Sequence, residues 1–264
     1  MTAAVQDFSL EEIRRDIDAI DDRLLELLGK RIIASVRVRQ VKSQTGTLAS
    51  SPVRPAREAM ILRRLMDRRQ PDISPDLLVR LWRVILTSSI LAQAPVTVHM
   101  SRALAATGRQ RALVAEHFCA IPVIEHDDEL AVLVHLSANR GDLGVVGLRS
   151  SWADHLAAGH GGETNVIGIL PVLKCGPGPE LVVFGHAEAQ PTGHDETIVL
   201  SRRPLPYEAT VDELWQIQCG SYCVSCLSGF LPDNGHPLIA LLRSDAALGL
   251  KIVGRYPGAI EVRS

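Results

Sequence analysis

Charged residues continue the apolar stripe of a helix predicted near the start of the chain. A step of four from Leu27 leads to Arg31, and Lys42 lies eleven residues after Arg31. Eleven residues are close to three helical turns, so the two cations share the face of the stripe. Arg14, near the start of the same helix, borders that stripe. This helix therefore carries cations where apolar side chains would be expected.

Two further predicted helices carry polar residues in the same way. Arg57 opens a row of residues spaced by four in the second helix, and Glu58 lies beside that row. In the third helix, an apolar row of the same spacing continues through Ser89 and Gln93. Seven polar residues on three helices thus lie on or beside apolar stripes.

The balance of charge among these seven residues indicates an anionic ligand. Burying a cation is costly unless a partner neutralises it, and Glu58 is the single acid beside four cations. A ligand with more than one carboxylate would correct this imbalance. The alternative is that each long side chain reaches water from the edge of the core. That explanation is the better one for any single residue, whereas the seven together favour a binding site.

The chemistry open to these residues needs no covalent step. They include no histidine, no cysteine and no serine beside a base, and their spacing matches no metal site. We therefore expect neither a cofactor nor a metal. Side chains of this kind can hold a flexible substrate in a reactive shape and stabilise the charge that develops.

A single long helix is predicted over residues 10–42. Its apolar residues recur at steps of three and four, and Ser9 with Glu12 forms a capping box at its start. At 1.5 Å per residue it would be roughly 50 Å long, which exceeds the diameter of a domain of about ninety residues. A partner chain is therefore the expected cover for its apolar stripe, and packing against the C-terminal half is the alternative.

Two shorter helices complete an all-α domain predicted over residues 1–95. The first of them is expected over residues 55–69. The other follows Ser74, which can cap it, has Pro75 at its first position and runs to about Gln93.

The pattern of the sequence changes after Pro95. Short β-rich runs alternate with helix-like stretches, and glycine and proline are concentrated there. This pattern predicts an α/β (α+β) domain over residues 96–264, and hence a multi-domain chain. Strands are expected at residues 96–99, 121–124, 143–147, 166–170, 181–184, 198–200, 238–242 and 251–253. Helices are expected at residues 109–119, 128–139 and 210–217.

Composition argues against several classes of function. Residues 1–94 hold 16 Lys and Arg against 12 Asp and Glu, and the remainder holds 12 against 18. The mildly basic first part suits a small anion, but it is too weakly basic and too poor in aromatic residues for nucleic acid. No apolar run approaches eighteen residues, so no membrane span is expected. The N-terminus also lacks the pattern of a signal peptide.

The five cysteines are odd in number and irregularly spaced, which favours a reducing cytoplasm over a disulfide framework. A zinc site could combine Cys219, Cys223 and Cys226 with Cys175 or His236 as a fourth ligand. Cysteines scattered through a cytoplasmic core are more common, and we favour that interpretation.

Three segments resemble the all-helical chorismate mutase family. They are RRDIDAIDDRLLELLGKRIIASVRVRQVK (14–42), VRPARE (53–58) and LLVRLWRVILTSSILAQ (77–93). The resemblance implies three-helix chains whose long first helices pair in an intertwined homodimer. It also implies conversion of chorismate to prephenate by a Claisen rearrangement, without a cofactor.

The same resemblance implies how the substrate carboxylates are held. Arg31 and Ser89 would bind one carboxylate of chorismate. Arg14, contributed across the interface by the other subunit, would bind the second.

The remaining residues would act on the ether and hydroxyl oxygens, again as the resemblance implies. Lys42 and Gln93 would donate hydrogen bonds to the ether oxygen, where negative charge builds up as the C–O bond breaks. Glu58 would bind the ring hydroxyl, and Arg57 would line the pocket beside it. The family often has an aspartate in the preceding loop, where this chain has residues 54–56 without one.

The C-terminal half is more faintly similar to a prephenate dehydratase with its regulatory domain. The similar segments are 141–156, 179–200 and 250–257. The catalytic Thr-Arg-Phe motif is missing, because Leu-Val-Val-Phe stands at residues 181–184. We therefore interpret residues 96–264 as a degenerate, non-catalytic dehydratase-like module that binds an aromatic amino acid effector or a partner enzyme.

The sequence therefore predicts a cytoplasmic chorismate mutase of phenylalanine and tyrosine biosynthesis. Two alternatives share the site: a bifunctional chorismate mutase/prephenate dehydratase, and an isochorismate pyruvate lyase.

Overall fold

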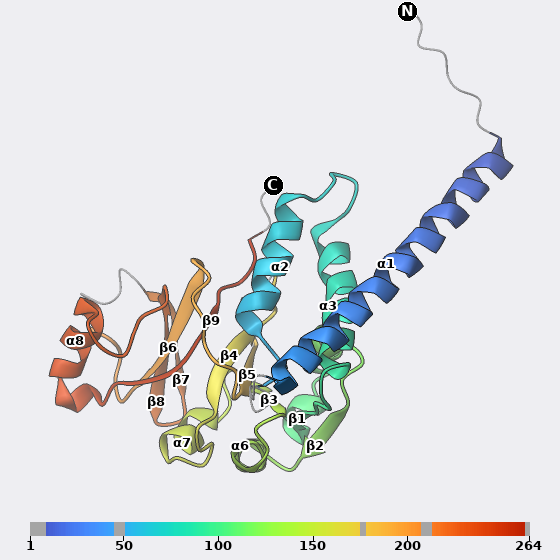
Figure 1. The fold of residues 1–264 in the computed structure, drawn as a ribbon. Helices are drawn as coiled ribbons and strands as arrows, with labels where there is room; N and C mark the ends of the chain where they lie inside the picture. Colours follow the sequence, from blue (N-terminus) through green and yellow to red (C-terminus); the bar gives the residue numbers. More distant parts are fainter. Residues whose placement is uncertain (1–8, 45–50, 175–177, 207–212, 262–264) are drawn as a thin grey trace, which may run out of the picture. The chain divides into compact units, whose positions relative to one another are not determined.

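The computed structural model describes residues 9–44, 51–174, 178–206 and 213–261 (Figure 1), with Lys42 and Ser43 described in their backbone only. The chain divides into two compact units, Met1–Leu48 and Ala49–Ser264. Within the described ranges, no helix combines the length and apolar character that crossing a bilayer requires.

Helix α1 (Leu10–Gln44) is the one regular element described in the first unit. It begins with the predicted capping box, in which the Ser9 amide donates to Glu12 Oε2 at 2.9 Å and the Glu12 amide donates to Ser9 Oγ at 3.2 Å. The hydrogen bonds from Ser9 lower the pKa of Glu12. The predicted long helix is therefore confirmed, together with its start.

The large apolar side chains of α1 are exposed along its whole length. They are Leu10, Ile13, Ile17, Ile20, Leu24, Leu25, Leu27, Leu28, Ile32, Ile33, Val36, Val38 and Val41. Exposed apolar surface of this extent normally marks an interaction face.

Helices α2 (Pro55–Asp67) and α3 (Pro75–Leu91) belong to the second unit. The Ser74 hydroxyl accepts a hydrogen bond from the Leu77 amide at 3.2 Å, and Pro75 occupies the first turn, as predicted. Both helices end within about two residues of the predicted ends.

The packing of α2 and α3 explains where the two units divide. Their apolar faces form one core cluster with two residues from the later part of the chain: Leu62, Leu78, Val79, Leu86, Leu173 and Ile260. The compact units therefore divide after Leu48, whereas the sequence predicts a domain boundary between residues 95 and 96. That boundary of the helical domain stays a prediction.

A mixed sheet of nine strands organises the described part of the second unit (Figure 1), in the order β2-β1-β3-β5-β4-β9-β6-β8-β7. The strands are β1 (Val98–Ser101), β2 (Val123–His126), β3 (Leu143–Gly147), β4 (Asn165–Leu170), β5 (Leu181–Gly185), β6 (Asp195–Ser201), β7 (Glu213–Cys219), β8 (Tyr222–Ser228) and β9 (Lys251–Pro257). Strands β2, β1 and β3 are parallel to one another, and β4 is parallel to β9. The other pairings are antiparallel.

Helices cover both faces of this sheet. They are α4 (Arg102–Ala105), α5 (Gly108–Phe118), α6 (Glu129–Ala138), α7 (Trp152–Ala157) and α8 (Pro237–Ser244). Successive residues of β3 face opposite helix layers. Val145 packs with α3 and α5, whereas Val146 packs with α6 and α7. Helix α8 packs on β6 and β8 through a third cluster. The predicted α/β architecture after residue 95 is thus confirmed.

Two predicted elements are wrong in type. Residues 238–242, expected as a strand, lie in helix α8, where Pro237 starts the helix and Leu238, Ile239 and Leu242 are buried. A short apolar run does not distinguish a strand from a buried helix.

The stretch 210–217 was expected to be helical, but β7 begins at Glu213 and pairs with β8. Residues 210–212 lie outside the described residues. The hairpin turns at Gly220, whose φ of +57° suits glycine. Pairing with β8 overrides the local helix-like pattern.

The cysteines of the predicted zinc alternative do not converge. Cys226 donates to Glu196 Oε2 at 3.2 Å, Cys223 to Gln218 Oε1 at 3.1 Å, and Cys219 to the Leu148 carbonyl at 3.0 Å. Burial raises the pKa of Cys219 to about 11, so it stays a thiol. Cys175 lies outside the described residues. Cys219, Cys223 and Cys226 are buried, whereas Cys119 is half-buried.

Candidate functional site

Three of the seven predicted site residues lie on α1. Arg14 is exposed and Arg31 is half-buried, and this burial lowers the pKa of the Arg31 guanidinium. Lys42 lies in the last turns of the helix, and its side chain is outside what the structure describes.

Two neighbouring predicted residues of α2 point in different directions. Arg57 is exposed, whereas Glu58 is turned inward. Arg83 of α3 donates from Nη1 to Glu58 Oε2 at 2.8 Å, and the two side chains are only 8% and 12% exposed. Glu58 therefore has a cationic partner outside the predicted set. The excess of positive charge within that set is correspondingly larger than the sequence count suggested.

Ser89 lies in the last turn of α3, and Gln93 follows two residues after the helix ends at Leu91, beside Ser89 as their spacing predicts. Ser89 is buried and donates to the Ile85 carbonyl at 2.8 Å. Gln93 is half-buried, and its Nε2 donates to the Ser89 carbonyl at 3.0 Å. One side of the Gln93 amide is thereby fixed to the helix end.

The structure thus brings together Ser89 with Gln93, and Glu58 with Arg83. Arg14, Arg31 and Lys42 belong to the other compact unit. A single site built from all seven residues remains a prediction.

Glu58 and Arg83 line a small, mostly apolar cavity of about 80 Å³. Thr87 and His117 line it together with apolar residues, and the Thr87 hydroxyl donates to the Arg83 carbonyl at 2.9 Å. Burial, followed by the charge on Arg83, holds the pKa of His117 well below its ordinary value. Glu58 Oε1 is buried without a hydrogen-bond partner among the described residues. The Glu58–Arg83 pair is therefore largely buried rather than on an open surface.

Sequence reasoning missed Arg83. It lies four residues after the buried Val79 and four before the buried Thr87. A second row of residues spaced by four, Val79–Arg83–Thr87, carries the signal that could have found it.

Removing Arg83 is expected to destabilise the second unit strongly. Arg83→Leu leaves Glu58 buried without its counter-ion, which costs about 3–5 kcal/mol in the free energy of unfolding. The double variant Glu58→Leu, Arg83→Leu should recover much of this loss, because both charges are gone. Urea denaturation, followed by circular dichroism, measures the free energy of unfolding of the single and the double variant.

Arg80 provides the control, three residues earlier on the same helix. It pairs with Asp76 at 3.0 Å, and both side chains are more than half exposed. Arg80→Ala should therefore cost no more than about 1 kcal/mol. Equal losses for the Arg80 and Arg83 variants would contradict the assignment of a buried pair.

Comparison with known proteins gives the helical part of the chain a family. Residues 13–94 match the family model of chorismate mutase type II. The N-terminal part of the chain carries a chorismate mutase type II domain. All seven predicted site residues fall within the matched range, and the resemblance recognised in the sequence is confirmed there.

Two curated relatives bear the name bifunctional chorismate mutase/prephenate dehydratase. The protein from Pseudomonas aeruginosa is 34% identical over 91 residues, and the one from Stutzerimonas stutzeri is 31% identical over 91 residues. These alignments cover 34% of this chain and 25% of each relative. The chain therefore matches about a quarter of the length of these relatives.

Two solved structures resemble a larger share of the chain, but weakly. They are described as "GqqA- a novel type of quorum quenching acylases" and as prephenate dehydratase from Streptococcus mutans. The TM-score is 0.40 for both, with 11% and 12% sequence identity, over 62% of this chain and 96% and 97% of theirs. Likeness at this level carries no argument about the C-terminal region, whose dehydratase-like character remains a prediction.

Proposed function

We propose that this protein is a chorismate mutase, which rearranges chorismate to prephenate for phenylalanine and tyrosine biosynthesis in the cytoplasm. The match of residues 13–94 to chorismate mutase type II is the observation that carries the proposal. The reaction breaks the ether C–O bond and forms a C–C bond within one molecule. Neither a nucleophile nor a cofactor is required.

The predicted residues supply what such a rearrangement needs. Arg31 and Ser89 bind one substrate carboxylate, and Arg14 of the second subunit binds the other. Holding both ends fixes the extended substrate in a compact reactive shape, which converts binding energy into rate.

Two hydrogen-bond donors stabilise the negative charge that develops on the ether oxygen. Lys42 and Gln93 donate to the ether oxygen, which becomes more negative as the C–O bond lengthens. Donors placed at that oxygen stabilise the transition state more than the ground state. Glu58 binds the ring hydroxyl, and Arg57 lines the site beside it. The buried Arg83 holds the Glu58 carboxylate in position through their ion pair.

We further propose that the active form is a homodimer whose first helices pair. The exposed apolar face of α1 supports this assembly, because a second α1 supplies a matching apolar surface. The dimer also provides Arg14 to the site of its partner.

Product analysis with chorismate tests the proposal. Prephenate as the sole product is expected, and loss of chorismate should need no metal or cofactor. Failure of the purified chain to turn over chorismate would reject the proposal. Release of pyruvate from isochorismate, faster than chorismate rearrangement, would favour the lyase alternative.

The same experiment distinguishes the bifunctional alternative. Residues Leu181, Val182, Val183 and Phe184 occupy the position of the dehydratase motif, and all four are buried within strand β5. A buried apolar strand offers no group for acid or base chemistry. We therefore expect no phenylpyruvate, and its formation would revive the bifunctional alternative.

A second candidate function is the binding of an aromatic amino acid effector. A cleft of about 850 Å³ in the second unit is lined by Trp215 and Tyr256 and by charged residues of both signs, among them Arg64 and Glu196. Its volume lies within the usual range for small-molecule sites. An apolar lining with charges of both signs suits a zwitterion with an aromatic side chain.

Calorimetry with phenylalanine, tyrosine and tryptophan tests the effector site. The full chain must be used, because α2 contributes to the cleft. Trp215→Leu should weaken binding at least about tenfold, through loss of a large buried aromatic contact. Trp82→Leu, outside the cleft, should leave binding unchanged. No heat with any of the three amino acids would argue against this candidate.

A further inference from the structure

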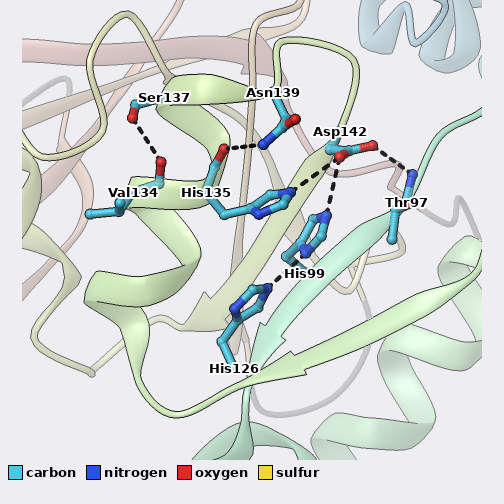
Figure 2. Close-up of polar contacts among 8 residues, drawn as sticks. All are labelled: Thr97, His99, His126, Val134, His135, Ser137, Asn139 and Asp142. Atoms are coloured by element: carbon cyan, nitrogen blue, oxygen red, sulfur yellow. Dashed lines mark hydrogen bonds and ion pairs between the residues drawn. The ribbon is translucent and has the colours of Figure 1, made fainter.

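Three histidines from separate elements meet beside the parallel part of the sheet (Figure 2). His99 lies in β1, His126 ends β2, and His135 lies in α6. One ring nitrogen from each lies within 4.8 Å of the other two. His99 Nδ1 and His126 Nε2 are 2.8 Å apart. Convergence of three imidazoles is the donor set that zinc-class metals prefer.

The Asp142 carboxylate contacts two of the three rings and orients them. Asp142 Oδ2 is 3.2 Å from His99 Nε2 and 3.4 Å from His135 Nε2. Its other oxygen, Oδ1, accepts a hydrogen bond from the Thr97 amide at 2.9 Å. Asp142 precedes β3, and the register that pairs Val98 with Leu143 fixes it next to β1. The backbone therefore holds the carboxylate in place, and the carboxylate holds the rings.

The three rings differ in how far they are buried. His99 is 1% exposed, whereas His126 and His135 are half-buried. The cluster therefore has one ring fixed in the core and two rings nearer to solvent.

We propose that His99, His126 and His135 bind a divalent transition metal of the zinc class, with Asp142 as the residue that orients them. His99 coordinates through Nδ1 while its Nε2–H donates to Asp142, the arrangement of a carboxylate–histidine–metal triad. His126 coordinates through Nε2. Three nitrogen ligands leave a fourth position for water.

Binding requires the rings to adjust, because the three ligand nitrogens now lie within 4.8 Å of one another. A tetrahedral zinc with Zn–N bonds of about 2.0–2.1 Å needs ligand nitrogens roughly 3.3 Å apart. His99 and His126 must therefore separate by about half an ångström. His126 is half-buried and the His135 side chain is 32% exposed, so both can move and solvent can reach the site. The site is independent of the proposed mutase function.

Cobalt binding tests the site directly. The full chain, prepared without a histidine tag, is titrated with Co²⁺, whose visible absorption reports its ligands. We expect one equivalent of Co²⁺ to bind per chain, without a thiolate-to-cobalt absorption band. Zn²⁺ should displace the bound Co²⁺. His126→Ala and His135→Ala should each abolish the signal. Asp142→Asn should weaken binding about 10–100-fold.

His160, which is exposed and outside the cluster, provides the control. His160→Ala should bind cobalt as the unchanged chain does. Excess Zn²⁺ should raise the Tm of the unchanged chain but not that of the cluster variants. Should His126→Ala fail to fold, His126→Gln keeps a hydrogen-bonding side chain and takes its place. Absence of binding, a thiolate band, or unchanged binding in both cluster variants would overturn the proposal.

Discussion

Replacing Gln93 by alanine is expected to lower kcat for chorismate by about 10²–10³-fold, the usual effect of removing one donor from a developing negative charge. The Gln93 amide is half-buried at the end of α3, and its Nε2 donates to the Ser89 carbonyl. That bond orients the side chain without adding to the core. Protein stability should therefore change little. Chorismate loss at saturating substrate measures kcat, and circular dichroism monitors the fold.

Gln70 is the matched control for this variant. It is exposed between α2 and α3, at a position with no proposed role. Gln70→Ala should keep the activity of the unchanged chain. A Gln93→Ala chain with kcat within twofold of that activity would refute the role assigned to the amide.

Placing a charge on the apolar face of α1 is expected to dissociate the proposed dimer and abolish activity. Leu24 is 52% exposed in the single chain. Burying a leucine side chain contributes about 1.5–3 kcal/mol, and a two-fold interface contains the residue twice. Leu24→Asp should thus raise the dissociation constant by at least about 100-fold. Sedimentation equilibrium measures the change.

Asp22 lies two residues earlier, on the opposite side of the helix. Asp22→Lys should leave both assembly and turnover unchanged. A second measurement mixes Arg14→Ala and Lys42→Ala chains, each inactive alone. If Arg14 acts across the interface, hybrid dimers hold one intact site, and about a quarter of the activity should return. An active monomer, or no recovery on mixing, would contradict the intertwined dimer.

The sequence alone predicted the three N-terminal helices and how they start. The capping box of Ser9 and Glu12 and the cap at Ser74 involve residues three positions apart. Such signals depend only on the local chain, as does the spacing that placed Ser89 and Gln93 on one face. Matching residues 13–94 to a family confirmed the resemblance that the same spacing suggested.

Only the tertiary structure decided contacts between residues far apart in the chain. Residues 238–242 became a helix and residues 213–217 a strand because neighbouring strands and packed helices selected one of two local options.

The histidine cluster and the Glu58–Arg83 pair depend on distance in space in the same way. His99 and His126 are 27 residues apart and meet through the register of β1 with β2, and Glu58 meets Arg83 through the packing of α2 on α3. Helical periodicity and caps are set by bonds between near neighbours. Strand register and interhelical pairing are set by burial over the whole unit, which no short window of sequence contains.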